Sequence, residues 1–251
     1  MNGLPCLSIG AGPPLIVLLF TPEAANPTGL ARRYLMRTVR PYTEHFTVHV
    51  LNRPPGLPPT TTMAELADCY AHALKATFTG PVNVLGLSSG GSAALQLAAD
   101  RPELVARLVL GGTACTLGPI GRRAQRAYID RARRGERPSP ALAELVTEST
   151  VGRTLVRALG WLADGRKDHT DAATMLGAED GFDLRGRLDD IKAPTLLIQG
   201  EKDVVYPLEL ARQTVAGIPG ARLISYPGRG HGATFTDRRF AADALAFLLG
   251  G

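Results

Sequence analysis

Residues 81–92 read PVNVLGLSSGGS and say more about the architecture than any other part of the chain. The apolar first half is typical of a buried strand, and the second half, rich in small residues, begins a helix. Between them Gly86, Ser88 and Gly90 spell G-x-S-x-G, the pattern of a nucleophile elbow. So tight a turn strains the central residue and tolerates no bulk at the two glycines. Ser88 is therefore the candidate nucleophile, and the N–H of Ser89, at a helix N-terminus, is a candidate oxyanion donor.

A serine hydroxyl is a weak nucleophile at neutral pH, so this hypothesis needs a histidine base and a carboxylate that orients it. Residues 193–199 read as a buried strand and lead into a polar turn that contains Asp203. About one strand later, the glycine-rich residues 227–232 contain His231. We predict that Asp203 is the acid and His231 the base.

Both assignments have rivals in the chain. Glu201 is an alternative acid two residues before Asp203, whereas residues 111–115, after the preceding strand, contain no carboxylate. Four other histidines are present: His45, His49, His72 and His169. None of the four follows the last predicted core strand, so His231 remains the favoured base.

The chain resembles the small α/β-hydrolases, in particular those of actinobacteria, over nearly its whole length. The segments that carry this resemblance are GPPLIVLLF, VNVLGLSSGG, RPELVARLVLGG, IKAPTLLIQGEKD and YPGRGHG. In this fold the nucleophile, acid and histidine follow one another in that order, each after a strand. The resemblance implies a helical lid over the serine, but no particular substrate, since the fold hosts hydrolases, lyases, transferases and receptors.

Strand and helix signals alternate along the chain, which predicts an α/β fold with a mostly parallel sheet flanked by helices. The alternation breaks in a helical, Arg-rich interval that contains Trp161. We expect a first part of the core with the elbow (residues 1–118), a helical lid (residues 119–190) and a second part of the core with the acid and histidine loops (residues 191–251). We interpret Trp161 as a packing residue of the lid.

The loop after the first core strand departs from the hydrolase pattern. Related hydrolases commonly have His-Gly-x there, with the third residue donating the second oxyanion N–H, whereas this chain has Phe20, Thr21, Pro22 and Glu23. Pro22, at the usual donor position, has no N–H. We expect Thr21 to donate through its amide or hydroxyl. The alternative is an incomplete oxyanion hole, and plant hydroxynitrile lyases resemble this chain in having Thr at the position of Thr21.

The composition limits the class of protein. A chain of 251 residues can bury a substantial single core without disulfides. Its three cysteines, an odd number without metal-type spacing, favour free thiols in a reducing cytoplasm. We find neither a signal sequence nor a membrane span, and expect a cytoplasmic protein. Neither metal-ligand spacing nor a dinucleotide fingerprint occurs, so we expect no cofactor and no metal.

The net charge of +5 comes mainly from arginine. Seven arginines concentrate in one stretch: Arg122, Arg123, Arg126, Arg131, Arg133, Arg134 and Arg137. We interpret this stretch as a solvated helix face; the alternative is a positive field that attracts an anionic partner such as a carrier protein or a coenzyme A thioester. Without aromatic interleaving or a nucleic-acid motif, we expect no nucleic acid and no membrane as partner. The oligomeric state stays open.

The sequence thus predicts a cofactor-independent serine hydrolase of an ester, thioester or lactone that works through an acyl-enzyme. Ser88 attacks, His231 transfers the proton, Asp203 orients the imidazole, and the N–H of Ser89 with a second donor holds the oxyanion. Two alternatives remain. One is a non-hydrolytic lyase, cyclase or elimination enzyme of a biosynthetic pathway, and the other is a small-molecule binding protein with a relic triad.

Overall fold

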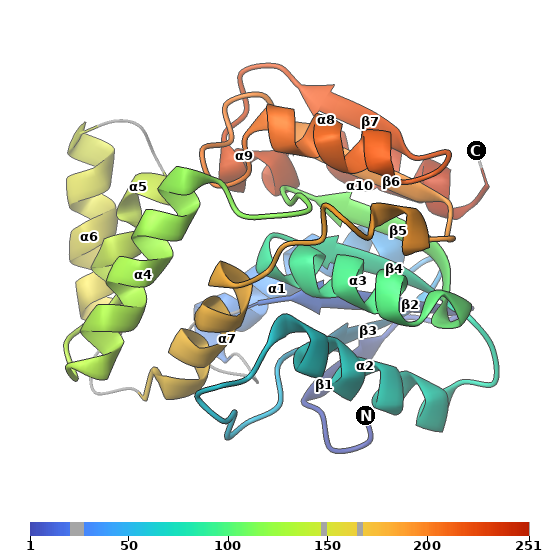
Figure 1. Ribbon diagram of the computed structural model, residues 1–251, viewed down its shortest axis with the longest axis horizontal. Coiled ribbons are helices and arrows are strands. Elements are labelled where there is room, and N and C mark those ends of the chain that lie inside the picture. The colour runs from blue at the N-terminus through green and yellow to red at the C-terminus, as the bar shows by residue number, and fades with distance from the viewer. Residues whose placement is uncertain (21–27, 147–149, 165–167, 251) are drawn as a thin grey trace.

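The computed structural model of the chain describes residues 1–20, 28–146, 150–164 and 168–250 (Figure 1). Seven strands form one sheet in the order β1-β3-β2-β4-β5-β6-β7. The edge strand β1 runs antiparallel to β3, and every other neighbouring pair is parallel. Helices pack on both faces, so the expected mostly parallel α/β sheet is confirmed.

The strands are β1 (Cys6–Ile9), β2 (Pro14–Leu19), β3 (Thr47–Leu51), β4 (Val82–Leu87), β5 (Val105–Gly111), β6 (Thr195–Gly200) and β7 (Arg222–Tyr226). The α-helices are α1 (Gly29–Val39), α2 (Met63–Thr77), α3 (Ser89–Asp100), α4 (Pro119–Arg133), α5 (Ala143–Val146), α6 (Thr150–Asp164), α7 (Thr170–Asp180), α8 (Leu208–Gly217), α9 (His231–Thr236) and α10 (Phe240–Leu248). Short 3₁₀ turns are η1 (Arg40–Tyr42), η2 (Pro102–Leu104), η3 (Ser139–Leu142) and η4 (Leu188–Asp190).

The two faces of the sheet bury two separate apolar clusters. Successive residues of a strand point to opposite faces, so Ile16 and Leu18 of β2 join the cluster under α2 and α3. Leu15 and Val17 join the cluster under α1 and α10. Burial on both faces explains why the parallel strands read as nearly continuous apolar runs in the sequence.

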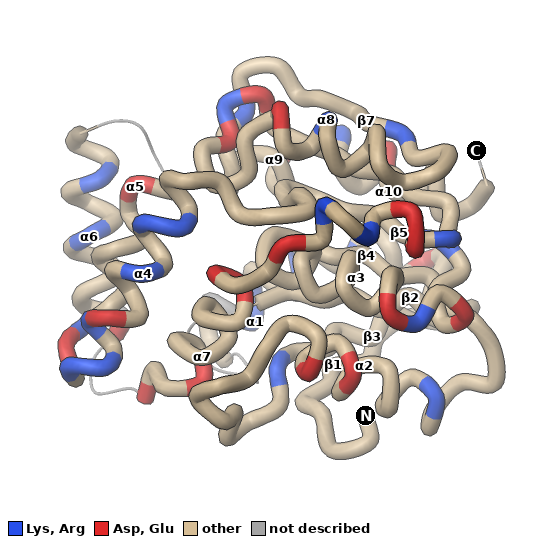
Figure 2. The backbone as a smooth tube through the Cα atoms, viewed as in Figure 1, with Lys and Arg blue, Asp and Glu red and all other residues tan. Residues whose placement is uncertain are grey.

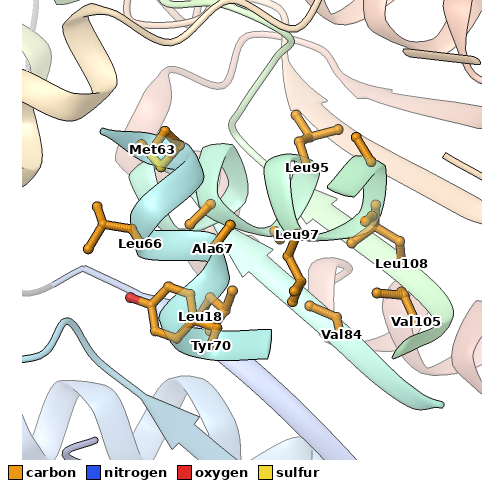
Figure 3. Packing of buried hydrophobic residues seen from close by; sticks show 14 of the residues in the cluster. Leu18, Met63, Leu66, Ala67, Tyr70, Val84, Leu95, Leu97, Val105 and Leu108 are labelled. Carbon is orange, nitrogen blue, oxygen red and sulfur yellow. The ribbon is translucent and has the colours of Figure 1, made fainter. Parts of the chain in front are cut away.

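Helix α2 begins at a capping box. The Thr62 hydroxyl accepts a bond from the N–H of Glu65, and the Glu65 carboxylate accepts one from the N–H of Thr62. From this start, Leu66 and Tyr70 point into the core, and Figure 3 shows α2 beside α3, whose Leu97 belongs to the same cluster. A local sequence signal thus sets the start of the helix, and burial of its apolar stripe holds it in place.

Two elements differ from the expectation. Strand β1 was not expected, because its residues are half-buried or exposed and lack the apolar run that marks the other strands. The segment expected as a glycine-rich loop ends in the short helix α9, which starts at His231 itself. Helix α9 is thus a separate short helix before the last helix, α10.

Helices α4 to α7 form an insertion between β5 and β6 that extends beyond one end of the sheet (Figure 1). Helix α7 packs against α4, and α6 packs on η3 and α5. The Trp161 ring, at a residue 52% exposed, lies under the Arg137 guanidinium, 3.5 Å from the ring centroid. The helical insertion is thus confirmed, and Trp161 packs against a guanidinium at the surface of α6.

Candidate active site

The elbow has the geometry that its sequence predicts. Ser88, between β4 and α3, has φ +53° and ψ −126°, a conformation that L-residues rarely adopt. A Cβ atom at Gly90 would lie 2.1 Å from the carbonyl oxygen of Leu18, and one at Gly86 would lie 2.6 Å from the Cβ of Ala94. The two glycines are therefore required by close contacts on either side of the strained serine.

The structure brings the three predicted side chains together at the carboxyl ends of β4, β6 and β7. Ser88 Oγ lies 2.8 Å from His231 Nε2, and His231 Nδ1 lies 2.8 Å from Asp203 Oδ2. Because an ionised carboxylate only accepts hydrogen bonds, Nδ1 carries the imidazole proton and donates it to Asp203. Nε2 is then free to accept the hydroxyl proton of Ser88.

The carboxylate of Asp203 is fully buried and held by four donors. Its Oδ1 accepts the N–H groups of Val205 at 2.8 Å and Tyr206 at 3.0 Å. Its Oδ2 accepts Gln199 Nε2 at 2.9 Å in addition to His231. Two donors on each oxygen satisfy the carboxylate without water, so its orientation toward the imidazole is determined by the protein alone.

Aromatic rings confine His231 on two sides. The Tyr206 ring stacks on the imidazole with centroids 5.9 Å apart and planes at 30°, and the Phe235 ring meets its edge at 5.2 Å and 87°. The His231 side chain is 14% exposed, and Ser88 is half-buried. The two aromatic rings hold the imidazole of His231 in the plane that joins Asp203 to Ser88.

The rival residues have other partners. Glu201 is exposed and accepts a bond from Ser225 Oγ at 3.1 Å, so within the described chain Asp203 is the carboxylate that contacts the imidazole. His49 bonds Ser8 Oγ, whereas His169 bonds the hydroxyl of Tyr128. His72 is exposed and bonds a backbone carbonyl of its own helix, and His45 is exposed.

The oxyanion hole is described in part. Ser89 is the first residue of α3, so its N–H takes no part in the hydrogen bonding within the helix and faces the turn. Thr21 and Pro22, on which the expectation of a second donor rests, lie outside the described residues. The second donor therefore stays a prediction.

Glu179 and Tyr206 lie next to the site, and neither was predicted from the sequence. Glu179, in the last turn of α7, is wholly buried and accepts hydrogen bonds from Ser89 Oγ and from the hydroxyl of Tyr206. Burial, reinforced by the nearby charge of Glu179, raises the pKa of Tyr206 well above its ordinary value. Glu179 follows Met175 by four residues and Leu176 by three, so it lies on the buried face of α7; a carboxylate at helical spacing from apolar residues is the signal that could have found it.

Figure 2 shows basic residues in blue along α4 of the insertion, and most arginines of the stretch are paired with carboxylates. Five of its seven arginines form ion pairs with three carboxylates: Arg122 and Arg126 with Asp180, Arg123 with Glu144, and Arg131 and Arg134 with Glu136. Most of these guanidinium groups are exposed, and exposed pairs contribute little to stability. The pairing favours the interpretation as a solvated helix face.

Membrane-spanning helices and metal sites are two further features by which classes of protein differ. In the part of the chain that the structure describes, no helix has both the length and the apolar character that crossing a membrane requires. No three side chains of His, Cys, Asp or Glu come together there in a group that could hold a metal ion.

Comparisons with known proteins agree on one family. A model described as "Alpha/beta hydrolase family" matches residues 25–244. The pimeloyl-[acyl-carrier protein] methyl ester esterase of Aromatoleum aromaticum is 31% identical over 195 residues, which cover 70% of this chain and 77% of the esterase. These matches leave the expected likeness to actinobacterial members in particular as a prediction.

Solved structures give the same result for the fold. A hydrolase from Pseudomonas aeruginosa superposes with a TM-score of 0.75 at 26% identity, covering 98% of this chain and 94% of that one. The enol-lactonase from Burkholderia xenovorans superposes with a TM-score of 0.74 at 22% identity, covering 98% and 96%. At 22% identity, the likeness to the enol-lactonase concerns the fold alone.

Proposed function

We propose that this chain, which belongs to the alpha/beta hydrolase family, is a cofactor-independent serine hydrolase of an ester, thioester or lactone. The observation that carries the proposal is the line of two 2.8 Å hydrogen bonds from Ser88 through His231 to Asp203. Around it, the strained elbow and the four donors on Asp203 are already in the arrangement that acyl transfer needs.

The reaction follows from the positions of the protons. Ser88 Oγ attacks the acyl carbon while its proton passes to His231 Nε2, and Asp203 stabilises the imidazolium. The N–H of Ser89, with a second donor, holds the oxyanion of the tetrahedral intermediate. The imidazolium then protonates the leaving alkoxide or thiolate, which leaves an acyl-enzyme at Ser88. Water, deprotonated by Nε2, attacks that acyl group by the same steps in reverse and releases the carboxylic acid.

The geometry favours an enzyme over a binding protein with a relic triad. A strained non-glycine residue costs on the order of 1–3 kcal/mol, and a protein that only binds a ligand gains nothing from strain at Ser88. The lyase alternative rests on Thr21 and Pro22, outside the described residues, and has no further observation in its favour. Acyl hydrolysis is therefore the function that we test first.

We infer that the insertion, expected at residues 119–190, acts as a lid that selects the acyl group. Helix α7 reaches the elbow through Glu179, and α5 lies next to α9, which carries His231. A disulfide that ties the insertion to the core should change the ratio of kcat/KM between bulky and small esters. An unchanged ratio would count against a lid.

The substrate class can be narrowed by charge. The Aromatoleum esterase acts, by its name, on a methyl ester carried by an acyl-carrier protein. In this chain, residues 119–164 contain nine arginines and five carboxylates. Although most arginines of the stretch are paired, the substrate named for the Aromatoleum esterase leads us to extend the proposal to acyl groups carried on an acidic carrier protein or on coenzyme A. For such a substrate kcat/KM should fall steeply between 50 and 500 mM salt, because screening weakens long-range attraction. An equally flat response to salt for carrier-bound and free esters would contradict this extension.

Covalent labelling tests the hydrolase proposal directly. A fluorophosphonate should form an adduct on Ser88, and p-nitrophenyl butyrate should be turned over; Ser88→Ala should lose both while remaining folded. Ser225→Ala, at a half-buried serine on β7, is the matched control and should keep both. A folded protein that forms no adduct would remove the nucleophile assignment. An adduct without turnover of any ester, thioester or lactone would favour the two alternatives.

A further inference from the structure

The carboxylate of Glu179 lies where the insertion meets the catalytic core. Its Oε2 accepts Ser89 Oγ at 2.7 Å and Gln125 Nε2 at 2.6 Å. Its Oε1 accepts Ser92 Oγ at 2.9 Å and the hydroxyl of Tyr206. Glu179 is on α7 and Gln125 on α4 of the insertion, whereas the other three partners belong to α3 and to the segment after β6.

Gln125 Nε2 donates, and the hydroxyls of Ser89, Ser92 and Tyr206 each have one hydrogen available, so that each oxygen of Glu179 can accept two bonds; Ser92 Oγ and the Tyr206 hydroxyl also lie 3.1 Å from each other. Four available hydrogens, two for each oxygen, can satisfy an ionised carboxylate without water. Glu179 is wholly buried, so the charge depends on these four bonds for its stability. The cluster therefore places a buried carboxylate in contact with Ser89, the residue after the proposed nucleophile.

Two of the four donors bear on the proposed reaction. Ser89 supplies the oxyanion N–H, and its side chain is held by Glu179, which limits rotation of the first residue of α3. The Tyr206 ring stacks on His231, and the N–H of Tyr206 bonds Asp203. One carboxylate thus restrains both the oxyanion donor and the wall against which the base lies.

We infer that Glu179 is a positioning residue of the active site, which acts through Ser89 and Tyr206. This inference rests on the proposed function, because it concerns the oxyanion and the imidazole of that reaction. Packing alone does not account for a carboxylate here: Met175, Leu176 and Ala178 of the same helix are buried apolar side chains. Replacing a buried charge by an apolar side chain of similar volume is often neutral or stabilising. A charge at this position therefore has a use other than packing.

Glu179 also connects the insertion directly with the proposed reaction, through its bonds to Ser89 and Gln125. Because Glu179 and Gln125 move with α7 and α4, a displacement of these helices changes the bonds to Ser89 and Tyr206. The position of the insertion can then affect the rate of the chemical step and not only access to the serine.

The test compares Glu179→Gln with Glu144→Gln, a matched substitution in α5, where the carboxylate meets Arg123 at the surface. Active sites are counted with the fluorophosphonate, and kcat and KM are measured with p-nitrophenyl butyrate. An aliphatic trifluoromethyl ketone, which forms a tetrahedral adduct with the serine, measures binding of the oxyanion.

We expect Glu179→Gln to lower kcat per active site about 10- to 100-fold, less than the two to three orders of magnitude typical for loss of an oxyanion donor. KM should stay within about twofold, and the affinity for the ketone should fall by the same factor as kcat, because both report the tetrahedral state. Glu144→Gln should match the wild type in all three. Ser89→Ala and Tyr206→Phe should each reproduce part of the loss in kcat. Combined with Glu179→Gln, each should lower kcat little further, because the effects of residues in one hydrogen-bond network are not additive.

A Glu179→Gln protein with a lower Tm but wild-type kcat and ketone affinity would overturn the inference, because a purely structural residue changes only stability. If Glu179→Gln does not fold, the inference is tested with Ser89→Ala and Tyr206→Phe, each of which removes one hydroxyl. A loss of kcat without a loss of Tm supports the inference. An unchanged kcat in both variants overturns it. Wild-type protein that turns over no acyl substrate would refute the proposed function and this inference together. An active wild type with an equally active Glu179→Gln would refute the inference alone.

Discussion

Replacing Asp203 by asparagine should trap His231 in the wrong tautomer. Because Oδ1 accepts the two backbone N–H groups of Val205 and Tyr206, the amide oxygen of an asparagine must take that position. Its NH₂ group then occupies the place of Oδ2, toward His231 and Gln199. There the NH₂ donates to Nδ1, so the imidazole proton moves to Nε2, which can no longer accept the proton of the nucleophile.

The loss should fall on turnover more than on folding or binding. A triad with this tautomer error loses about 10⁴-fold in kcat, which corresponds to about 5.5 kcal/mol of transition-state stabilisation. KM should change little, because the side chain of Asp203 is fully buried and does not reach a substrate. Stability should fall by about 1–3 kcal/mol, since the new NH₂ faces the donor Nε2 of Gln199 and one buried hydrogen bond is lost.

The assay is turnover of p-nitrophenyl butyrate per titrated active site, together with ¹⁵N NMR of the His231 ring to locate its proton. Glu201→Gln, on the same turn, is the control and should keep wild-type kcat, because that carboxylate contacts Ser225. A loss below tenfold in Asp203→Asn, or a ring that keeps its proton on Nδ1, would refute the reasoning. An inactive Glu201→Gln would transfer the acid role to Glu201.

Stability measurements test the elbow and one ion cluster. Because Ser88 has φ +53°, Ser88→Gly should be more stable to urea than Ser88→Ala by about 1 kcal/mol, and equal values would contradict the strain. In Gly90→Ala the added methyl would lie 2.1 Å from the carbonyl oxygen of Leu18, so Tm should fall by at least about 6 °C; a wild-type Tm would contradict the close approach. The Arg239 guanidinium holds the pKa of Asp237 far below its usual value. The ionised carboxylate therefore stabilises the fold at any pH above its unfolded-state pKa of about 4. This contribution is lost as the pH falls from there through the lowered pKa of the folded state. The Tm of Asp237→Asn should therefore lie below that of the wild type at pH 7 and approach it below about pH 4; a gap independent of pH would argue against the ion pair.

Local patterns predicted well wherever the physical cause is also local. The capping box at Thr62 and Glu65 needs only neighbouring residues, and the strained turn at Ser88 is recognisable from five consecutive residues, although Gly90 is also required by its approach to Leu18. Elements with weak local signals were harder to find. The edge strand β1 is held by pairing with β3 and not by an apolar run, and the helix at His231 begins in a glycine-rich segment whose sequence reads as a loop.

The sequence alone was enough to predict that Ser88, Asp203 and His231 lie together, because parallel strands present their carboxyl ends at one edge, and each residue follows such a strand. Chain order and position after a strand are one-dimensional properties. The place of Glu179 is not: it depends on how α7 and α4 pack over α3, and hence on contacts between residues about 50 to 90 positions apart. Such contacts form only when burial of apolar surface brings distant helices together, so tertiary structure alone decided which carboxylate contacts Ser89.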